Sequence, residues 1–412
     1  MKINRYVIPL LAINLWCAPL ASFSKDMSWV RTLRQILPPF KIEQIHPDGT
    51  GLVLRNPSPH GKWLVQSHER YSKWVVENAG VSPRCLYLYN KDGKLIRDLT
   101  YGKFQNANLA SWSQSDDSLF INGSESNMGK DGVWKLDLKS NTFFRMNSLL
   151  PWLPSGHVET VTDGGASRGG IGYASFPYFS PNSDSYLLVD ETFKKIKTDG
   201  GVKVRNLLYR VWMKSGKRKL LAEGDSPKWS PNGYWILFNY ALNRRTRPSF
   251  MRDQGDGEIW IVRSNGAQKR CLIGEKALAR AIEQSPARSY PSKKVEQIMK
   301  SIPGYGGVTQ WGLSKHRWMY AYVTGYWWIA SKQPEVIVAA HGEYEWGDGS
   351  NWIWLMNVNG RILKKAPLPG TVQLISGSAD GKHFYFSSVL KSPDGNIAKE
   401  SYYRVTMRMS QR

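Results

Sequence analysis

The segment PKWSPNGYWILFNYA (Pro227–Ala241), with GEIWIVRSNGAQKRCLI (Gly257–Ile273) after it, contains the signals from which the architecture follows. Its first half places Trp229 before a Ser-Pro-Asn-Gly turn that leads into an alternating strand. Its second half places Asn265-Gly266 between two more such runs. Asn-Gly in this setting is typical of a hairpin whose two central residues have positive φ. The expected strands are 234–238, 259–263 and 269–273, and together they predict a small antiparallel sheet.

The same turn and strand recur along the chain, about 64 residues apart on average. The six copies are SPHGKWLV (Ser58–Val65), SQSDDSLF (Ser113–Phe120), SPNSDSYLL (Ser180–Leu188), SPNGYWILF (Ser230–Phe238), GLSKHRWMY (Gly312–Tyr320) and SADGKHFYF (Ser378–Phe386). A single unit of this kind cannot bury its apolar face alone. The repeats therefore predict an all-β fold, a six-bladed β-propeller of four-stranded antiparallel blades.

The N-terminal part of the chain is expected to close this ring. The last repeat ends with the strand that begins at Tyr402, so its blade lacks an outer strand, and we expect residues 41–45 to supply it. This pairing would remove two open sheet edges. Helical spacing of apolar residues predicts a short helix at 26–37 that plugs one edge of the ring, and residues 51–55 are predicted as another strand.

The turn Trp/Phe-Ser-Pro-Asn/Asp-Gly, followed by a strand, Ile-Trp and an Asn-Gly or Asp-Gly hairpin, resembles the TolB-like (WD-like) propeller repeat. The resemblance covers roughly residues 57–409 and is clearest in the first and fourth repeats. It implies the propeller fold and says little about function. TolB itself has an additional N-terminal α/β domain, for which this chain has no room.

Residues 1–24 have the basic, apolar and small-residue regions of a secretory signal peptide, in that order. The alternative is a membrane anchor, but the apolar run is short for a spanning helix. Residues 25–412 are expected to form one propeller domain, with a helical insertion at about 274–309. We expect a secreted or periplasmic monomer. Cys85 and Cys271 fall on different blades, so they are predicted to be small buried apolar residues without a disulfide.

The connections of antiparallel blades alternate between two faces of the ring. The short turns share one face, called the turn face here, and the long, dissimilar connections share the other, the loop face. Long loops on a rigid scaffold commonly bind ligands or carry catalysis. This rule places His68, His157 and His341 on the loop face, and His60, His316 and His383 on the turn face.

Lys and Arg number 56 against 33 Asp and Glu, a net charge of +23. In an exported protein this excess favours an anionic polysaccharide as partner over nucleic acid, whereas the alternative is that the charge only maintains solubility. Arg side chains match carboxylate and sulfate groups. The candidate substrate-binding residues are Arg70, Lys194, Lys195, Lys197, Arg244, Arg245, Arg247 and Trp327.

Two functions remain open. In the first, the loop face cleaves a uronate-containing polysaccharide by β-elimination, which needs a group that neutralises the carboxylate and a base near the acidic carbon. The candidate catalytic residues are His157 or Arg168 as neutraliser, Tyr173 or His341 as base, and His68. In the second, the protein is a non-catalytic TolB-like module that binds a glycan or an envelope protein.

No cofactor is required by either function. The sequence HGEYEWGDGSN (His341–Asn351) could hold a divalent ion, Ca²⁺ or Zn²⁺, through Glu343, Glu345 and Asp348, although the spacing fits no known metal loop. The chain lacks the Gly-x-Ser-x-Gly elbow, the phosphate-binding Gly-Lys-Ser/Thr loop and the His-Glu-x-x-His zinc helix. These absences argue against serine hydrolases, nucleotide hydrolases and helix-based zinc proteases.

Overall fold

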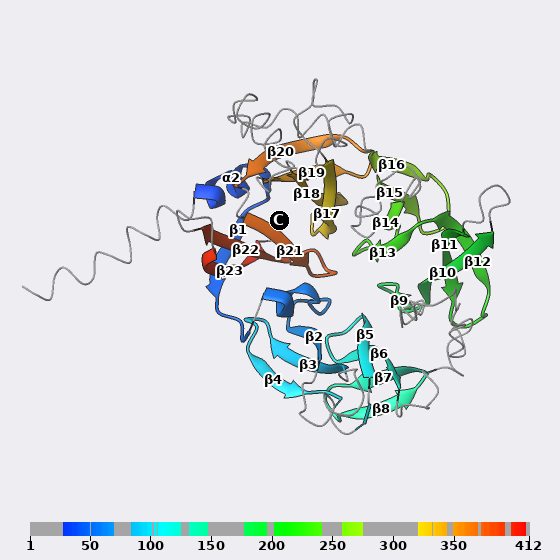
Figure 1. Cartoon of the computed structure of the whole chain (residues 1–412). Coiled ribbons are helices and arrows are strands. Elements are labelled where there is room, and N and C mark those ends of the chain that lie inside the picture. The colour runs from blue at the N-terminus through cyan, green and yellow to red at the C-terminus, as the bar shows by residue number, and fades with distance from the viewer. Residues whose placement is uncertain are drawn as a thin grey trace, which may run out of the picture.

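The computed structural model shows six antiparallel sheets arranged in a ring (Figure 1). It describes residues 28–49, 51–69, 84–100, 103–104, 106–124, 132–146, 177–195, 202–240, 258–274, 320–331, 333–343, 349–369, 372–391 and 397–408. The predicted signal peptide and the helical insertion lie outside these ranges.

Each sheet is one blade, and in five of the six the strands follow in sequence order from the axis outward; in the sixth, the N-terminal strand is the outermost. Blade 1 contains β2 (Trp63–Glu69), β3 (Arg84–Asn90) and β4 (Leu95–Asp98); blade 2 contains β5 (Asn106–Trp112), β6 (Ser118–Ser124), β7 (Gly132–Asp137) and β8 (Thr142–Arg145); blade 3 contains β9 (Tyr178–Phe179), β10 (Ser185–Lys195), β11 (Val202–Trp212) and β12 (Arg218–Glu223). Blade 4 contains β13 (Asp225–Trp229), β14 (Trp235–Tyr240), β15 (Glu258–Arg263) and β16 (Arg270–Ile273); blade 5 contains β17 (Tyr320–Ile329), β18 (Glu335–Glu343), β19 (Gly349–Asn357) and β20 (Ile362–Leu368); blade 6 contains β21 (Val372–Gly377), β22 (His383–Lys391), β23 (Ile397–Met407) and β1 (Phe40–Ile45). The six-bladed propeller is therefore confirmed. In blade 1 the place of the innermost strand is taken by a single bridge between Pro57 and Leu64.

In four of the blades the first turn is built around a buried serine. Ser230 Oγ accepts the N–H of Trp235 at 2.9 Å, its own N–H donates to the Trp235 carbonyl at 2.8 Å, and Gly233 takes a φ of +73° to reverse the chain. The equivalent hydroxyls of Ser58, Ser180 and Ser378 accept backbone N–H groups in the same way. A buried hydroxyl thus replaces water for backbone groups that the turn leaves unpaired.

The Asn265-Gly266 hairpin forms where it was predicted, with a different turn type. Gly266 has a φ of +86°, but Asn265 is not among the described residues with positive φ. Gly266 N–H donates to the Arg263 carbonyl at 2.8 Å, and Arg263 N–H donates to the Ala267 carbonyl at 2.9 Å. These bonds define a three-residue loop with one left-handed glycine, so the expectation of two positive φ values was wrong.

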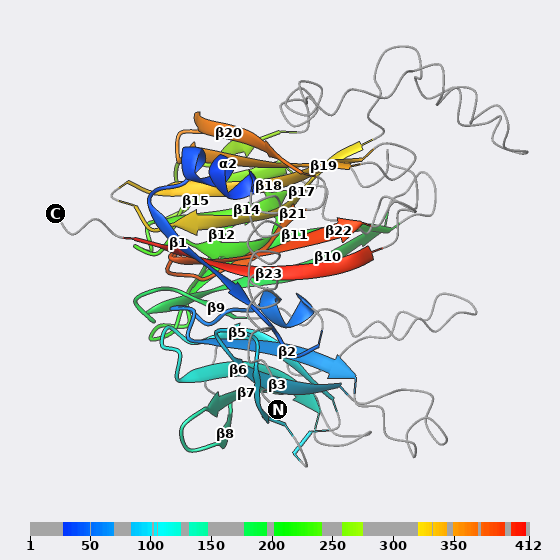
Figure 2. The same ribbon diagram turned by 90° about the vertical axis from the view of Figure 1, so that its left-hand side faces the viewer.

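The apolar core is divided among the six junctions between adjacent blades. Each junction holds one cluster of buried side chains, and the largest, between blades 5 and 6, includes the helix α2 (Ser28–Ile36). Trp29 of this helix lies 5.5 Å from Phe386 and 5.3 Å from Tyr403 between ring centroids. Figure 2 shows α2 beside β20 at one side of the ring. The predicted helix is confirmed within two residues at its start and one at its end.

Indole N–H groups also join neighbouring blades close to the axis. They donate to carbonyls of the preceding blade in the pairs Trp112 to Asn56 (3.3 Å), Trp229 to Tyr178 (2.8 Å) and Trp328 to Lys228 (3.1 Å). The Trp in front of the serine turn therefore contributes a directional bond as well as apolar surface.

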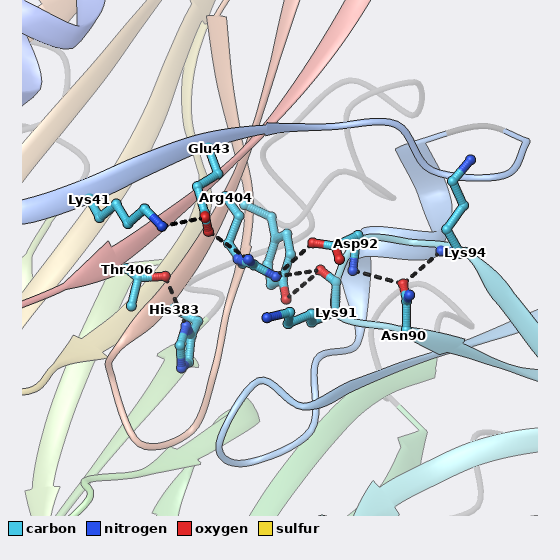
Figure 3. Close-up of polar contacts among 10 residues, drawn as sticks. Lys41, Glu43, Asn90, Lys91, Asp92, Lys94, His383, Arg404 and Thr406 are labelled. Atoms are coloured by element: carbon cyan, nitrogen blue, oxygen red, sulfur yellow. Dashed lines mark hydrogen bonds and ion pairs between the residues drawn. The ribbon is translucent and has the colours of Figure 1, made fainter.

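The N-terminal strand closes the ring as expected. β1 pairs antiparallel with β23, from Phe40 opposite Met407 to Ile45 opposite Tyr402. Behind this pair, Arg404 connects blade 6 to blade 1, because it bonds Glu43 of β1 and both Asp92 and the Lys91 carbonyl of the β3–β4 hairpin (Figure 3).

Two predictions of local structure were wrong. Residues Gly51–Arg55 form a short 3-10 helix, η1, and not a strand; its Val53 and Leu54 are buried, and a five-residue apolar run does not distinguish the two forms. The fifth repeat was aligned on GLSKHRWMY, but Tyr320 begins the innermost strand β17, and the first turn of blade 5 follows Ile329.

Candidate functional site

The innermost segments of the blades border the axis, and one position in them recurs with the repeat. The residue two places before the turn serine is Asn56, Ser111, Tyr178, Lys228 and Ser376 in the five blades that have this serine. Lys228 is the charged member of this set. It lies on β13, where its neighbour in the ring is β17 of blade 5.

The Lys228 ammonium is held by neutral groups of β17. Its Nζ donates to the Tyr326 carbonyl at 2.9 Å, and it lies 4.9 Å from the Tyr326 ring centroid and 4.6 Å from that of Trp327. Among the described residues no carboxylate lies within ion-pair distance of this amine. Ring faces attract cations, but they do not cancel a full charge.

Desolvation lowers the pKa of Lys228 to about 7. The side chain keeps part of its surface accessible, yet protein atoms surround the amine closely enough to disfavour its charged form. Lys228 therefore changes protonation state near neutral pH, which an exposed lysine does not do.

Two tyrosines and one carboxylate complete this group, which we call the axial cluster: Tyr178, Asp225, Lys228, Tyr326 and Trp327. Tyr326 OH donates to the Ser226 carbonyl at 2.6 Å, and Asp225 accepts the Asn206 amide at 3.3 Å. Burial, followed by the Asp225 charge, raises the pKa of Tyr178 to about 12 and raises that of Tyr326 well above its usual value. Both phenols therefore stay protonated at neutral pH, and the Tyr326 hydroxyl serves as a hydrogen-bond donor.

Trp327 was predicted as a substrate-binding residue on a long loop of the loop face, and this placement was wrong. It lies within β17, is 7% exposed, and its ring covers Gly325, where an added Cβ would come within 1.9 Å of the indole. The error follows from the misaligned fifth repeat. The structure brings Trp327 to the axial cluster, in contact with a cation that was not among the predicted site residues.

A second arrangement lies toward the loop side of blade 5. His341 of β18 is opposite Asn351 of β19, and its Nδ1 lies 2.6 Å from Asn351 Oδ1. The Asn351 amide nitrogen donates to the Val372 carbonyl at 2.6 Å, which orients its oxygen toward the histidine. Nδ1 must then carry the proton, so the neutral ring has its lone pair on Nε2. This tautomer suits a general base or a metal ligand.

The remaining predicted site residues are not brought together by the described parts of the chain. Lys194 and Lys195 end β10, His68 lies near the end of β2 and Glu343 ends β18, each described by its backbone alone. The others lie outside the described residues: Arg70, His157, Arg168, Tyr173, Lys197, Arg244, Arg245, Arg247, Glu345 and Asp348. Their roles stay predictions.

The structure was also searched for metal sites and for membrane spans. Within the described ranges, no group of three or more His, Cys, Asp or Glu side chains could hold a metal ion. None of the helices in those ranges is long and apolar enough to cross a membrane. Cys85 and Cys271 form no disulfide, as expected; Cys85 is buried and Cys271 half-buried.

The turn face also carries exposed basic side chains, although the candidate binding residues were expected on the loop face. Exposed Lys214, Lys217, Arg263, Lys269 and Arg361 lie in or next to the outer hairpins of blades 3, 4 and 5. Others join these hairpins: Lys219 Nζ donates to the Asn265 carbonyl at 2.8 Å, and Arg270 Nε to the Val358 carbonyl at 2.8 Å. Positive charge is thus present on the turn face, from which none of the candidate substrate-binding residues was drawn.

The chain is similar in structure to several solved propellers. An oligogalacturonate lyase in complex with manganese shares 11% identity at a TM-score of 0.43, over 90% of this chain and 97% of the other. An oligogalacturonate lyase from Vibrio parahaemolyticus shares 9% at 0.38, over 90% and 98%, and TolB from Acinetobacter baumannii shares 11% at 0.39, over 86% and 66%. No protein-family model matches the chain, and no curated protein matches it in sequence. TolB is therefore among the structural neighbours, as the repeat predicted, and at these identities the likeness concerns the fold alone.

Proposed function

We propose that this protein is an exported propeller that binds an acidic polysaccharide. The observation that carries the proposal is its uncompensated positive charge. Basic residues exceed acidic ones by 23. Ion pairs of the described residues, such as those of Lys41, Lys94, Arg210 and Arg404, each use one of the fewer acidic side chains, so they cannot remove this excess. Positive charge thus remains for an external polyanion, and outside the cytoplasm such polymers are chiefly acidic glycans.

Cleavage by β-elimination is the second candidate, and the fixed tautomer of His341 favours it. A base on Nε2 would take the proton on the carbon next to a uronate carboxylate. The electron pair left behind forms a carbon-carbon double bond and expels the glycosidic oxygen, which is then protonated. Asn351 would act as a positioning residue, because it holds Nδ1–H and keeps the lone pair on Nε2.

Binding is tested by retention of the chain without residues 1–24 on immobilised polygalacturonate, alginate and heparin. We expect retention at about 50 mM salt and release as salt rises, because screening weakens contacts between exposed charges. A neutral glucan column is the control. Passage through all three anionic columns without delay would contradict the proposal.

Cleavage is tested by the ultraviolet absorbance of an unsaturated product with the same polymers in solution. A lyase that uses His341 would lose the signal in His341→Ala and keep it in His60→Ala, a change on the opposite face. Asn351→Ala should shift the pH profile of kcat/KM, which a purely structural role would not do. A flat trace for the wild type, together with retention on the columns, would leave a binding module. Export itself is tested by fractionation and N-terminal sequencing of the mature protein.

A further inference from the structure

The axial cluster contains a cation for which the described part of the chain provides no counter-ion within ion-pair distance. A lysine whose amine is largely enclosed by protein atoms is usually paired with a carboxylate, because an isolated charge is costly to desolvate. Lys228 instead contacts one carbonyl and two aromatic rings, all of which are neutral. Asp225, three residues away on the same strand, accepts a bond from Asn206 and makes no ion pair with Lys228 among the described contacts.

We propose that the Lys228 ammonium binds a carboxylate, or another oxyanion of similar size, beside the axis between blades 4 and 5. An ammonium has three N–H donors, and the Tyr326 carbonyl takes one of them. The other two can bond the oxygens of one oxyanion. The incoming charge would supply the counter-ion that the described residues do not provide.

The same surroundings indicate what is attached to the oxyanion. The rings of Tyr326 and Trp327 lie within 5 Å of the amine. Both residues are buried, 6% and 7% exposed, so they enclose the amine on one side, and only the half-buried lysine itself is open to a ligand. A compact carboxylate, from a small organic acid or from the uronate unit of a glycan, therefore fits better than a bulky anion. The inference does not depend on the proposed polysaccharide function, because a free acid would satisfy it.

The alternative is that Lys228 only joins blades 4 and 5 through its carbonyl bond and its ring contacts. The two possibilities differ in their response to anions. A structural cross-link gains nothing from added acetate, whereas an anion site is stabilised by mass action, by RT ln(1 + [anion]/Kd). The probe is therefore sodium acetate compared with sodium chloride at equal ionic strength, and sodium sulfate as a second oxyanion.

The first measurement is the thermal midpoint. We expect acetate or sulfate to raise the Tm of the wild type above its value in chloride, and Lys228→Met to abolish the difference. Lys62→Met is the matched control, because Lys62 also lies over an indole, at 5.1 Å from the Trp63 ring, but on an exposed turn; it should keep the shift. An equal shift in wild type and Lys228→Met would overturn the proposal.

A second measurement needs no variant and covers the case in which Lys228→Met does not fold. The native protein is acetylated with N-acetoxysuccinimide near neutral pH, and each lysine is quantified by peptide mapping. Acetate at about ten times its Kd should slow the labelling of Lys228 about tenfold and leave Lys62 unchanged. Labelling of Lys228 that is insensitive to both oxyanions would contradict the proposal.

The source of the oxyanion is decided by the polygalacturonate column. If the group belongs to a polymer, Lys228→Met weakens retention as well as the response to acetate. If it belongs to a free acid, the response to acetate is lost and retention is unchanged. Failure of the column binding in the wild type would count against the proposed function, but not against the site.

Discussion

Arg404 Nη2 lies 2.6 Å from Glu43 Oε2, although 361 residues separate them in the chain. The guanidinium side chain is 7% exposed, and its Nη1 lies 2.8 Å from Asp92 of blade 1. One buried cation therefore bonds the N-terminal strand, the C-terminal strand and the first blade (Figure 3). Two carboxylates compensate its charge, and the arrangement occurs where the ring closes.

Glu43→Gln should destabilise the protein by roughly 1–3 kcal/mol, because it removes a charged partner of a buried guanidinium. Lys41→Met is the matched control: Lys41 bonds the same carboxylate at 2.6 Å but is 59% exposed, so its loss should cost less than about 1 kcal/mol. Urea denaturation measures both. Equal losses of stability in the two variants would mean that the bond from Glu43 to the buried Arg404 contributes no more than the bond from Glu43 to the exposed Lys41.

The same carboxylate predicts a loss of stability in acid. Hydrogen bonds from Lys41 and then from Arg404 lower the pKa of Glu43 to about 2, from 4.5 in the unfolded chain. A lowered pKa stabilises the fold fully above pH 4.5, and this contribution disappears as the pH falls from 4.5 toward 2. The unfolding free energy of the wild type should therefore fall more steeply across this range than that of Glu43→Gln. Parallel curves for the two proteins would contradict the assignment.

Alanine substitutions at two turn glycines distinguish the cost of backbone strain from the cost of a steric clash. Gly233 and Gly381 occupy equivalent turns with φ values of +73° and +72°. A Cβ on Gly233 would meet nothing closer than 3.6 Å, whereas on Gly381 it would lie 2.5 Å from the backbone nitrogen of Ala330. Gly233→Ala should cost roughly 1–2 kcal/mol, and Gly381→Ala about 1–3 kcal/mol more. Urea midpoints of the two variants measure the difference, and similar midpoints would show that blade 5 moves away freely.

Removal of the N-terminal segment should destabilise blade 6 and its packing against blade 5. A chain that begins at residue 46 lacks β1 and α2, which leaves one edge of β23 unpaired and the blade 5–6 cluster without Trp29 and Leu33. We expect a lower Tm and aggregation, compared with a chain that begins at residue 25. A peptide of residues 25–46 added in trans should restore part of the loss. A truncated chain with the full-length urea midpoint would refute this role.

The blades were predictable because their signals are local. A serine turn such as Ser230-Pro-Asn-Gly and a hairpin glycine such as Gly266 determine chain reversals within a few residues. Blade 5 was misaligned because its true first turn, after Ile329, has neither this serine nor a glycine, while GLSKHRWMY imitates the pattern. The long runs of β17 also lack the alternation that identifies a half-buried strand.

The candidate site was less predictable, because it depends on contacts between blades. Lys228 belongs to the repeat motif itself and was read as part of the fold. Alignment of the five serine turns would have shown it as the charged residue at an otherwise uncharged position beside the axis. Trp327 covers one side of the Lys228 amine only because β17 packs against β13. The pairing of His341 with Asn351 needs the register of two strands, which the sequence does not encode locally.

The pairing of β1 with β23 also determines when the ring can close during synthesis of the chain. Glu43 is synthesised 361 residues before Arg404. At about 5–20 residues per second, the first strand waits roughly 20–70 s for its partner. During that time five blades can form while an apolar segment remains unpaired, available to a chaperone or to a neighbouring nascent chain. Ring closure therefore comes late in folding, when the early-synthesised strand β1 pairs with the late-synthesised strand β23.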